Sequence, residues 1–469
     1  MSRKKNIEIQ NLALTSAGAK GFSFGKTEEG KTVMVQNAVP GDVVNVQVIK
    51  SKKNYYEAQV IDFVKYSSDR VEPKCRHFGL CGGCKWQNLA YEKQLEYKSQ
   101  EVFNNIKKIG KIEPFEYLPI VPSDETYGYR NKMEYSFSAS RWLTAEEICS
   151  QNEIRDRNAL GFHIPRQWSK VLDISECFLQ VEPSNKIRNS IKKFAEKNSM
   201  DFYDFQNRKG FLRTLMIRSN SKNEFMVLVQ FFEEDKEKQE MLLSFIQTEF
   251  PQVKTLLYAV NPKGNDTLYD LDIQTFNGDG FLMEQIENMQ FKIGARSFFQ
   301  TNYHQAVKLY EIARNFAGLS GSETVYDLYT GTGTIAQFVA AKAKKVVGIE
   351  SVSEAIESAK ENAKLNNITN CTFFCGDMKD IFTQEFISEN GRPDVIITDP
   401  PRDGMHKKVV ETILDISPEK IVYISCNSAT QARDLEMMKD RYETVKIQAV
   451  DMFPQTHHVE SVALLRLIK

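Results

Sequence analysis

Short runs of alternating apolar and polar positions dominate the first 66 residues of the 469-residue chain. A period of two is typical of β-strands, and glycine and proline between the runs mark turns. The clearest runs cover residues 31–35, 42–48 and 56–60. About five such strands in this length predict a small OB-like barrel, a fold that often binds nucleic acid.

Helical and strand patterns follow one another without a regular order in the middle of the chain, up to residue 290. Apolar residues three or four apart predict helices, and runs of β-branched and aromatic residues predict strands. The helices are expected over residues 91–110, 184–197 and 235–249, and the strands over residues 133–138, 214–218 and 225–231. Residues 141–158 are polar and irregular, and we expect them to form an inserted loop. The middle of the chain is therefore predicted to be an α+β domain.

Strands and helices alternate strictly from residue 291 onward. Short apolar runs predict strands over residues 324–329, 345–350, 394–398 and 421–425, with a helix over residues 353–366. This alternation is typical of a doubly wound, mostly parallel sheet with helices on both faces. The fold class predicted for the chain is therefore multidomain α/β, ending in a Rossmann-like domain.

The composition is that of an ordinary soluble globular protein, with 41% hydrophobic and 26% charged residues. No apolar run is long enough to span a membrane, and the N-terminal residues lack the apolar stretch of a signal peptide, so we expect a cytoplasmic protein. The net charge of −1 conceals a basic first hundred residues, with 16 lysines and arginines against 10 acidic residues. That excess fits either a nucleic-acid surface or ordinary solvated surface.

A glycine-rich loop follows the strand at residues 324–329 and opens the next helix, with the sequence Gly331-Thr332-Gly333-Thr334-Ile335-Ala336. Glycines at this position let a ligand approach the backbone closely. Glu350 ends the next strand, where a carboxylate can accept hydrogen bonds from both hydroxyls of a ribose. The loop and the acid together fit NAD as well as S-adenosylmethionine (SAM).

Three further acidic positions favour SAM over NAD. Asp327 lies in the strand before the loop, and Asp377 follows the third strand, where methyltransferases recognise adenine. The fourth strand ends in Asp399-Pro400-Pro401-Arg402, a turn that lines the methyl-transfer site of many SAM enzymes. Each acid taken singly also fits a helix cap or a solvated side chain, but the set predicts a SAM site.

Three cysteines lie close together in a second glycine-rich loop, with the spacing Cys75-x5-Cys81-x2-Cys84. Three thiols need a fourth ligand, for which Cys177 is the best candidate. Four thiolates suit either zinc or an iron–sulfur cluster, and spacing does not separate the two. The five residues between the first pair argue against a radical-SAM enzyme, in which that gap is shorter.

One further cysteine, Cys426, directly follows the apolar run at residues 421–425. A strand there delivers its side chain to the carboxyl edge of the sheet, where open α/β folds bind ligands. A thiol at this edge is a candidate nucleophile, although an isolated cysteine at a strand end is more often part of the core.

Several longer motifs accompany these residues: Tyr129-Arg130-Asn131-Lys132-Met133-Glu134-Tyr135, Phe298-Phe299-Gln300-Thr301-Asn302, Ser425-Cys426-Asn427 and the stretch from Asp451 through His457-His458-Val459 to Glu460. Together with the cysteines and the D-P-P-R turn, they resemble the bacterial family of RNA uridine-C5 methyltransferases, in particular its 23S ribosomal RNA branch. The resemblance extends over nearly the whole chain. One departure is Ser428, where the family usually has proline.

The resemblance implies three domains: a TRAM-like RNA-binding barrel over residues 1–66, a central domain over residues 67–290 and a SAM-dependent methyltransferase domain over residues 291–469. It implies a [4Fe–4S] cluster held by Cys75, Cys81, Cys84 and Cys177. It also implies SAM contacts from Gln300, Tyr329, Glu350 and Asp399, with Asp377 as a weaker candidate for adenine.

The resemblance further implies the chemistry. The Cys426 thiolate adds to C6 of uracil, C5 is methylated, and Glu460 removes the C5 proton. Arg130, Lys132 and Phe298 would hold RNA or the flipped base. The expected partner is 23S rRNA, and the expected state is a monomer.

Three alternatives stay open at this point. The first is the same chemistry on another rRNA uridine or on tRNA, although the tRNA branch typically lacks the barrel and the cluster. The chain would otherwise be a non-catalytic RNA-binding ribosome-assembly factor, or an iron–sulfur oxidoreductase. The retention of both Cys426 and Glu460 argues against the assembly factor, and the D-P-P-R turn argues against the oxidoreductase.

Overall fold

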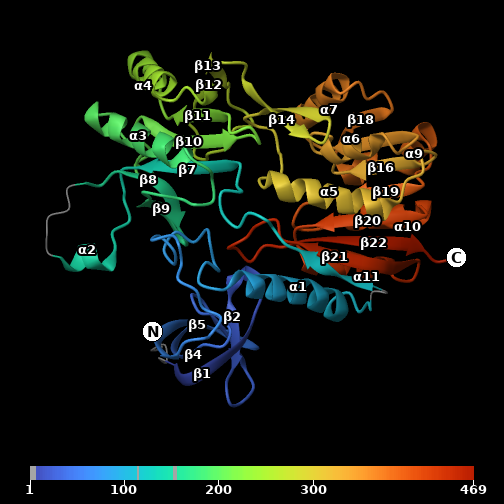
Figure 1. Ribbon diagram of the computed structural model, residues 1–469, viewed down its shortest axis with the longest axis horizontal. Coiled ribbons are helices and arrows are strands. Elements are labelled where there is room, and N and C mark those ends of the chain that lie inside the picture. The colour runs from blue at the N-terminus through green and yellow to red at the C-terminus, as the bar shows by residue number, and fades with distance from the viewer. Residues whose placement is uncertain (1–6, 114–115, 151–155) are drawn as a thin grey trace.

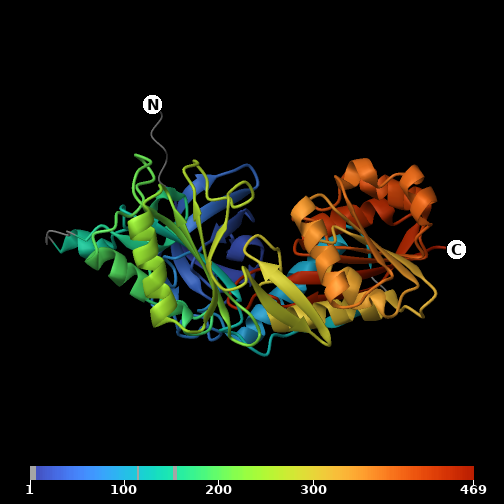
Figure 2. The same cartoon turned by 90° about the horizontal axis from the view of Figure 1, so that it is seen from above.

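Three bodies make up the molecule, which the computed structural model describes for residues 7–113, 116–150 and 156–469. An N-terminal barrel lies beside a central domain, and a C-terminal domain adjoins both (Figure 1). The hairpin of β14 (Phe281–Ile286) and β15 (Met289–Gly294) sits between the central and C-terminal domains (Figure 2). No helix within the described ranges is both long enough and apolar enough to cross a membrane.

Five strands form the closed N-terminal barrel, in the order β1-β2-β3-β5-β4. Their bounds are β1 (Glu8–Ala17), β2 (Ser23–Lys26), β3 (Thr32–Val35), β4 (Val43–Ser51) and β5 (Tyr55–Lys65). Alternate side chains point inward, so that Leu12, Val33, Val44 and Ala58 fill the core. The barrel predicted from the period of two is confirmed.

The central domain is built on a seven-stranded sheet in the order β13-β12-β11-β10-β7-β8-β9. The strands are β7 (Lys132–Ser138), β8 (Ala159–Ile164), β9 (Gln167–Asp173), β10 (Leu212–Ser219), β11 (Phe225–Phe231), β12 (Val253–Val260) and β13 (Gln274–Asn277). Helices α3 (Ser184–Lys197) and α4 (Lys236–Glu249) pack on one face through Ile187, Ile191, Leu242 and Ile246.

The polar insertion is not wholly irregular. It contains the short helix α2 (Ala145–Cys149), which Thr144 and Glu147 start with a reciprocal capping box. Residues 151–155 of this expected loop lie outside the described residues.

The C-terminal domain has an eight-stranded sheet in the order β18-β17-β16-β19-β20-β22-β21-β6. The strands are β6 (Glu116–Val121), β16 (Thr324–Leu328), β17 (Lys345–Glu350), β18 (Cys371–Cys375), β19 (Val395–Thr398), β20 (Lys420–Ser425), β21 (Tyr442–Val450) and β22 (Glu460–Leu467). One face is covered by α5 (Tyr303–Ala317), α6 (Thr334–Ala340) and α7 (Ser353–Leu365). The other face is covered by α1 (Tyr91–Lys108), α8 (Met378–Ile381), α9 (Gln384–Asn390), α10 (Lys407–Ile416) and α11 (Ser428–Met438). The predicted sandwich of helices around a mostly parallel sheet is confirmed.

Two elements from the first third of the chain belong to this C-terminal sheet. Strand β6 pairs in parallel with β21, and α1 packs along β6, β21 and α11 (Figure 1). The reason is apolar packing, because Val102 and Ile106 of α1 join the core on that face of the sheet. The expected central domain of residues 67–290 thus includes a segment that packs with the C-terminal domain.

A fully buried ion pair holds helix α1 against the C-terminal domain. Lys98 of α1 lies 2.6 Å from Asp451, and both side chains have 0% exposure. Removing one partner leaves a buried charge uncompensated, so Lys98→Met is expected to lower the free energy of unfolding by about 3–5 kcal/mol. Urea denaturation measures the change. Lys107→Met is the matched control on the same helix, because Lys107 and its partner Glu113 are largely exposed; its expected effect is below about 1 kcal/mol. Equal effects of the two substitutions would contradict the role of burial.

Candidate active site and adjoining cysteine pocket

The two catalytic candidates lie at the same edge of the C-terminal sheet. Strands β20 and β22 are antiparallel, and Ser425 lies opposite Ser461. Because Cys426 follows the end of β20 and Glu460 begins β22, the fold brings their side chains to one edge. The charge of Glu460 acts directly on the Cys426 thiol, as expected for neighbours.

The surroundings of Cys426 disfavour its thiolate. Burial, together with the carboxylates of Glu460 and Asp399, raises the pKa of the thiol to about 11. Arg402 opposes this shift, chiefly through its charge. Arg402 belongs to the D-P-P-R turn after β19, so the turn supplies both a carboxylate and a cation to the nucleophile. The turn is recognisable in the sequence, but the placement of Arg402 beside Cys426 is not, because the two residues belong to separate segments.

Glu460 belongs to a row of three carboxyl groups, in which Glu460 and Asp327 are buried and Asp399 is half-buried. Burial and the charge of Asp399 raise the pKa of Glu460 to about 8, with Arg402 acting in the opposite direction. Burial and Asp327 likewise raise the pKa of Asp399 to about 7. Neighbouring carboxylates in a low dielectric cannot all ionise together. The row therefore holds protons near neutral pH, which suits a group that takes up and releases a proton.

The glycine loop opens beside these groups. Gly331 and Gly333 have φ values of 56° and 74°, in the left-handed region. A Cβ added at Gly333 would lie 2.8 Å from Cβ of Ala359, so no side chain fits there. Asp327 braces the loop by accepting hydrogen bonds from Thr330 Oγ1 at 2.5 Å and from the amide of Ala336 at 3.0 Å.

Glu350 lies at the same loop. One carboxylate oxygen accepts from the Gly331 amide at 3.2 Å, and the other accepts from the Val352 amide at 3.0 Å. The carboxylate is therefore held rigidly at the tip of β17, next to the backbone of the glycine loop. Such a fixed acceptor suits a ribose diol.

The other predicted SAM contacts have different surroundings. Tyr329 directly follows β16, is half-buried, and has a φ of 64°. Gln300 is buried in the segment between β15 and α5, which touches the glycine loop where Thr332 Oγ1 donates to the Phe298 carbonyl at 3.5 Å. Asp377, in contrast, caps α8 and pairs with Lys379 at 2.8 Å. Its side chain is thus engaged as a helix cap, the simpler alternative for this residue.

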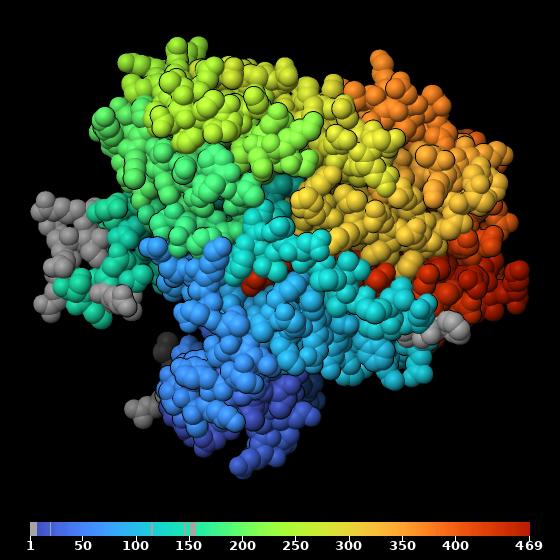
Figure 3. Space-filling model, viewed as in Figure 1, coloured from blue at the N-terminus to red at the C-terminus, as the bar shows by residue number. Residues whose placement is uncertain are grey.

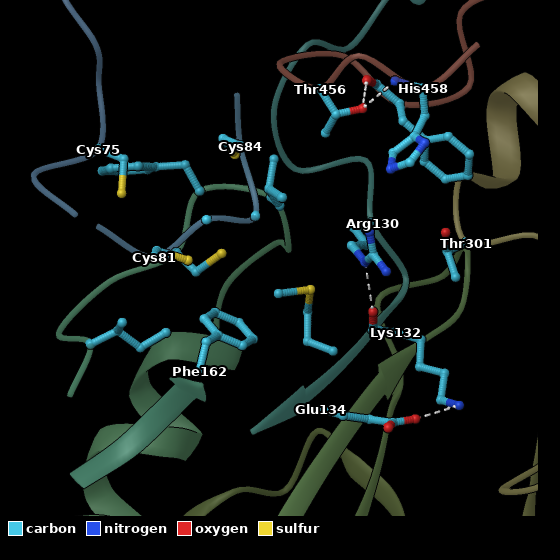
Figure 4. A pocket seen from close by; sticks show the side chains of 18 of the residues that line it. Cys75, Cys81, Cys84, Arg130, Lys132, Glu134, Phe162, Thr301, Thr456 and His458 are labelled. Atoms are coloured by element: carbon cyan, nitrogen blue, oxygen red, sulfur yellow. Dashed lines mark hydrogen bonds and ion pairs between the residues drawn. The ribbon is translucent and has the colours of Figure 1, made fainter. Parts of the chain in front are cut away.

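A cavity of about 740 Å³ adjoins the reactive edge. Figure 4 shows Cys75, Cys81 and Cys84 on one side of it and Arg130, Thr301 and His458 on the other. All three predicted RNA contacts line the cavity: Arg130, Lys132 and Phe298. Arg402 also lines the cavity and connects it to Cys426.

Cations and exposed aromatic rings gather around this cavity. Phe298 is 67% exposed and Tyr269 is 62% exposed. Besides the predicted residues, the lining includes Arg218, Arg296 and Tyr269, which sequence reasoning missed because they come from separate segments with no common motif. A basic cavity with exposed rings at its wall is suited to a nucleotide, whose phosphate and base it can contact separately.

The four predicted cluster cysteines are brought together by the fold. Cys177 lines the same cavity as Cys75, Cys81 and Cys84, although nearly a hundred residues separate it from them. Burial raises the pKa of the Cys81 thiol to about 11 and that of Cys84 to about 12, and Cys177 and Cys75 contribute to both shifts. The all-sulfur donor set fits a thiolate-held metal group. In the described part of the chain, however, no three His, Cys, Asp or Glu side chains are arranged as ligands of a single metal ion.

The two histidines before Glu460 are neutral. Burial lowers the pKa of His457 to about 3 and that of His458 to about 4. Their rings lie 4.1 Å apart, and Phe453 packs against His458. Both rings therefore have packing contacts, and His458 also lines the cavity.

This chain matches two family models and is similar in sequence to known proteins. Residues 279–468 match the family described as tRNA (Uracil-5-)-methyltransferase, and residues 3–61 match the TRAM domain. A Bacteroides thetaiotaomicron protein named as an RNA methyltransferase is 50% identical, over 96% of this chain and 99% of its own length. A Porphyromonas gingivalis protein with the same name is 48% identical, over 97% of this chain and 99% of its own length.

A solved structure shares the whole architecture. Pyrococcus abyssi tRNA (uracil-54, C5)-methyltransferase, in complex with S-adenosyl-L-homocysteine, is 28% identical, with a TM-score of 0.75, over 97% of this chain and 100% of its own. The chain belongs to the family of SAM-dependent RNA (uracil-5-)-methyltransferases, with an N-terminal TRAM domain.

Proposed function

We propose that this protein methylates C5 of a uridine in RNA through a covalent bond between Cys426 and C6 of the base. The observation that carries the proposal is the shared sheet edge, where the half-buried Cys426, the buried Glu460 and the exposed Arg402 adjoin each other. A thiol and a carboxyl group with a raised pKa are the two groups that this reaction needs.

The chemistry follows from the poor nucleophilicity of uracil C5. Addition of the Cys426 thiolate to C6 pushes the electron pair of the C5–C6 double bond toward C5 and the O4 carbonyl. SAM supplies the methyl group that C5 takes up. Glu460 then accepts the C5 proton, the double bond re-forms, and the thiolate of Cys426 leaves. Arg402 favours the thiolate both as attacking and as leaving group, since it lowers the pKa of the thiol.

The target uridine must leave its stack to reach a half-buried thiol. The cavity offers Arg130 and Lys132 for phosphates and the exposed ring of Phe298 for stacking. These residues support single-stranded or loop RNA as the bound form. The TRAM barrel would extend the surface that holds the RNA.

We propose 23S rRNA as the first candidate substrate, on the strength of the cysteine set and the motifs that resemble the rRNA branch. tRNA is the second candidate, favoured by the full-length likeness to the Pyrococcus abyssi enzyme. That likeness also covers the barrel, so the barrel does not separate rRNA enzymes from tRNA enzymes.

Trapping the covalent adduct tests both the chemistry and the substrate. The protein is incubated with SAM and with 5-fluorouracil-containing fragments of 23S rRNA or with 5-fluorouracil-containing tRNA, and the products are analysed by mass spectrometry. Fluorine at C5 cannot be removed as a proton, so the adduct persists. An adduct with an rRNA fragment is the expected result. An adduct only with tRNA would select the second candidate, and no adduct with any RNA would refute the mechanism.

We also propose that Cys75, Cys81, Cys84 and Cys177 hold a [4Fe–4S] cluster with a structural and RNA-positioning role. No redox step is needed by the proposed chemistry. Anaerobically prepared protein is expected to contain about four iron and four sulfide per chain, and Cys81→Ala is expected to lose them. Cys149→Ala is the control, since Cys149 is exposed in the insertion and does not line the cavity that the four cysteines share. Protein without iron and sulfide would contradict the cluster.

A further inference from the structure

The segment that leads into Glu460 is held from two sides. Residues 451–459 connect β21 to β22 through bends and turns. From one side, Lys98 of α1 donates to Asp451 Oδ1 at 2.6 Å and to the Phe453 carbonyl at 3.0 Å. From the other, Asn302 at the start of α5 donates to the Met452 carbonyl at 3.0 Å. In Figure 3, red atoms from the C-terminal part of the chain lie between light-blue and cyan atoms of its first third.

Gln455, in the middle of this segment, is hydrogen-bonded to the end of the loop that carries Cys75, Cys81 and Cys84. Its carbonyl accepts hydrogen bonds from the backbone amides of Lys85 at 2.9 Å and Trp86 at 3.0 Å. These two residues directly follow Cys84. Gln455 has a φ of 67°, a left-handed conformation that a side-chain-bearing residue keeps only where its surroundings hold it. The cysteine loop therefore shapes the backbone five residues before Glu460.

The buried side-chain amide of Gln94 forms further hydrogen bonds with Gln455. Gln94 of α1 is 1% exposed. Its Oε1 accepts from the Gln455 amide at 2.9 Å, and its Nε2 donates to Gln455 Oε1 at 3.1 Å. The same Nε2 donates to the carbonyls of Trp86 at 2.9 Å and Leu89 at 2.8 Å. Gln94 thus joins α1, the end of the cysteine loop and the Glu460 segment at one point.

We infer that Gln94, together with the amides of Lys85 and Trp86, is a positioning device for Glu460. The inference rests on the proposed function, in which Glu460 is the base. Gln94 touches no reacting atom and acts through Gln455. Cys426 is carried instead by β20, inside the sheet, and has no hydrogen bond to the 451–459 segment among the described residues. Glu460 itself pairs with Val450 of β21 at the start of β22, so Gln94 acts on the segment that leads into this strand, whereas Cys426 follows β20.

This separation predicts an unequal effect of Gln94→Ala. With 5-fluorouracil RNA, the adduct forms without help from Glu460, so its rate of formation is expected to stay within about twofold of wild type. With ordinary RNA, release of the C5 hydrogen is expected to fall about 10- to 100-fold, because a base displaced by about 1 Å loses its alignment. The methylated RNA should then accumulate as a covalent adduct. Tritium release from 5-tritiated uridine and denaturing gels measure the two steps.

Two further variants make the test specific. Gln455→Ala keeps the backbone groups that Lys85, Trp86 and Gln94 bind and loses only one side-chain contact, so its defect in tritium release is expected to be smaller than that of Gln94→Ala. Asn370→Ala is the matched control, because Asn370 also donates to two carbonyls, those of Ala340 and Ala343, at the opposite edge of the sheet. Asn370→Ala is expected to leave both steps unchanged.

The outcomes separate the inference from the proposed function. If wild-type protein forms no adduct with 5-fluorouracil RNA, the proposed function itself fails. If wild type forms the adduct but Gln94→Ala slows both steps equally, or neither, the positioning role is refuted. Should Gln94→Ala not fold, Gln94→Met decides, because methionine fills a similar volume without the hydrogen bonds of the amide: a selective loss of tritium release supports the inference, and its absence overturns it.

Discussion

Glu460→Gln is expected to stop the reaction after the covalent step. Glutamine keeps the size of the side chain but cannot accept the C5 proton, so Cys426 adds to C6, C5 is methylated and the enzyme stays attached to its product. Loss of a positioned general base costs about 10²- to 10⁴-fold in rate. Ordinary uridine-containing RNA should therefore give a methylated adduct that is stable on a denaturing gel, whereas wild type releases free RNA.

The pH dependence provides a second check on Glu460. A base works only when deprotonated, and burial together with Asp399 raises the pKa of Glu460 to about 8. Resolution of the adduct by wild type should accordingly rise with pH up to about 8 and then level off. Adduct resolution that is fast at pH 6 and insensitive to pH, or normal turnover by Glu460→Gln, would contradict the assignment of Glu460 as the base.

Cys426→Ala is expected to abolish both the adduct and methylation. Without the thiolate, C5 stays a poor nucleophile, and methyl transfer should fall below about one-thousandth of the wild-type rate, as is common when a nucleophile is removed. SAM affinity should change less than about twofold, because the glycine loop and Glu350 belong to other strands. Transfer of a labelled methyl group and SAM-binding calorimetry measure the two quantities. Cys149→Ala is the control for a thiol without a role. Persisting methylation in Cys426→Ala would rule out covalent catalysis by this residue.

Much of the fold follows from local patterns. The period of two in the first 66 residues predicts the barrel, and the strand–helix alternation after residue 291 predicts the doubly wound sheet. The position of Cys426 at the edge follows from the strand that precedes it. These features depend on residues that are neighbours in the sequence, so the pattern of apolar and polar residues is enough to predict them.

Contacts between distant segments could not be predicted in this way. Nothing in the sequence of α1 and β6 indicates that they pair with β21, because an amphipathic helix and a short strand fit many partners. The placement of Arg402 beside Cys426 and the hydrogen bonds between Gln94 and Gln455 likewise join separate segments. Asp377 as an adenine ligand stays a prediction from its place after the third strand, and the structure shows its side chain as the cap of α8.

The pairing of β6 with β21 has a consequence for biosynthesis. Helix α1 and strand β6 leave the ribosome long before β21 and β22, the strands that link β6 to the rest of the sheet. Domains generally fold from the N-terminal end as the chain is made. The apolar stripe of α1 and the open edge of β6 must therefore wait for the last strands, and an isolated fragment of residues 291–469 would expose β21 as an unprotected edge strand. The nascent chain is thus expected to need chaperone protection until translation is almost finished.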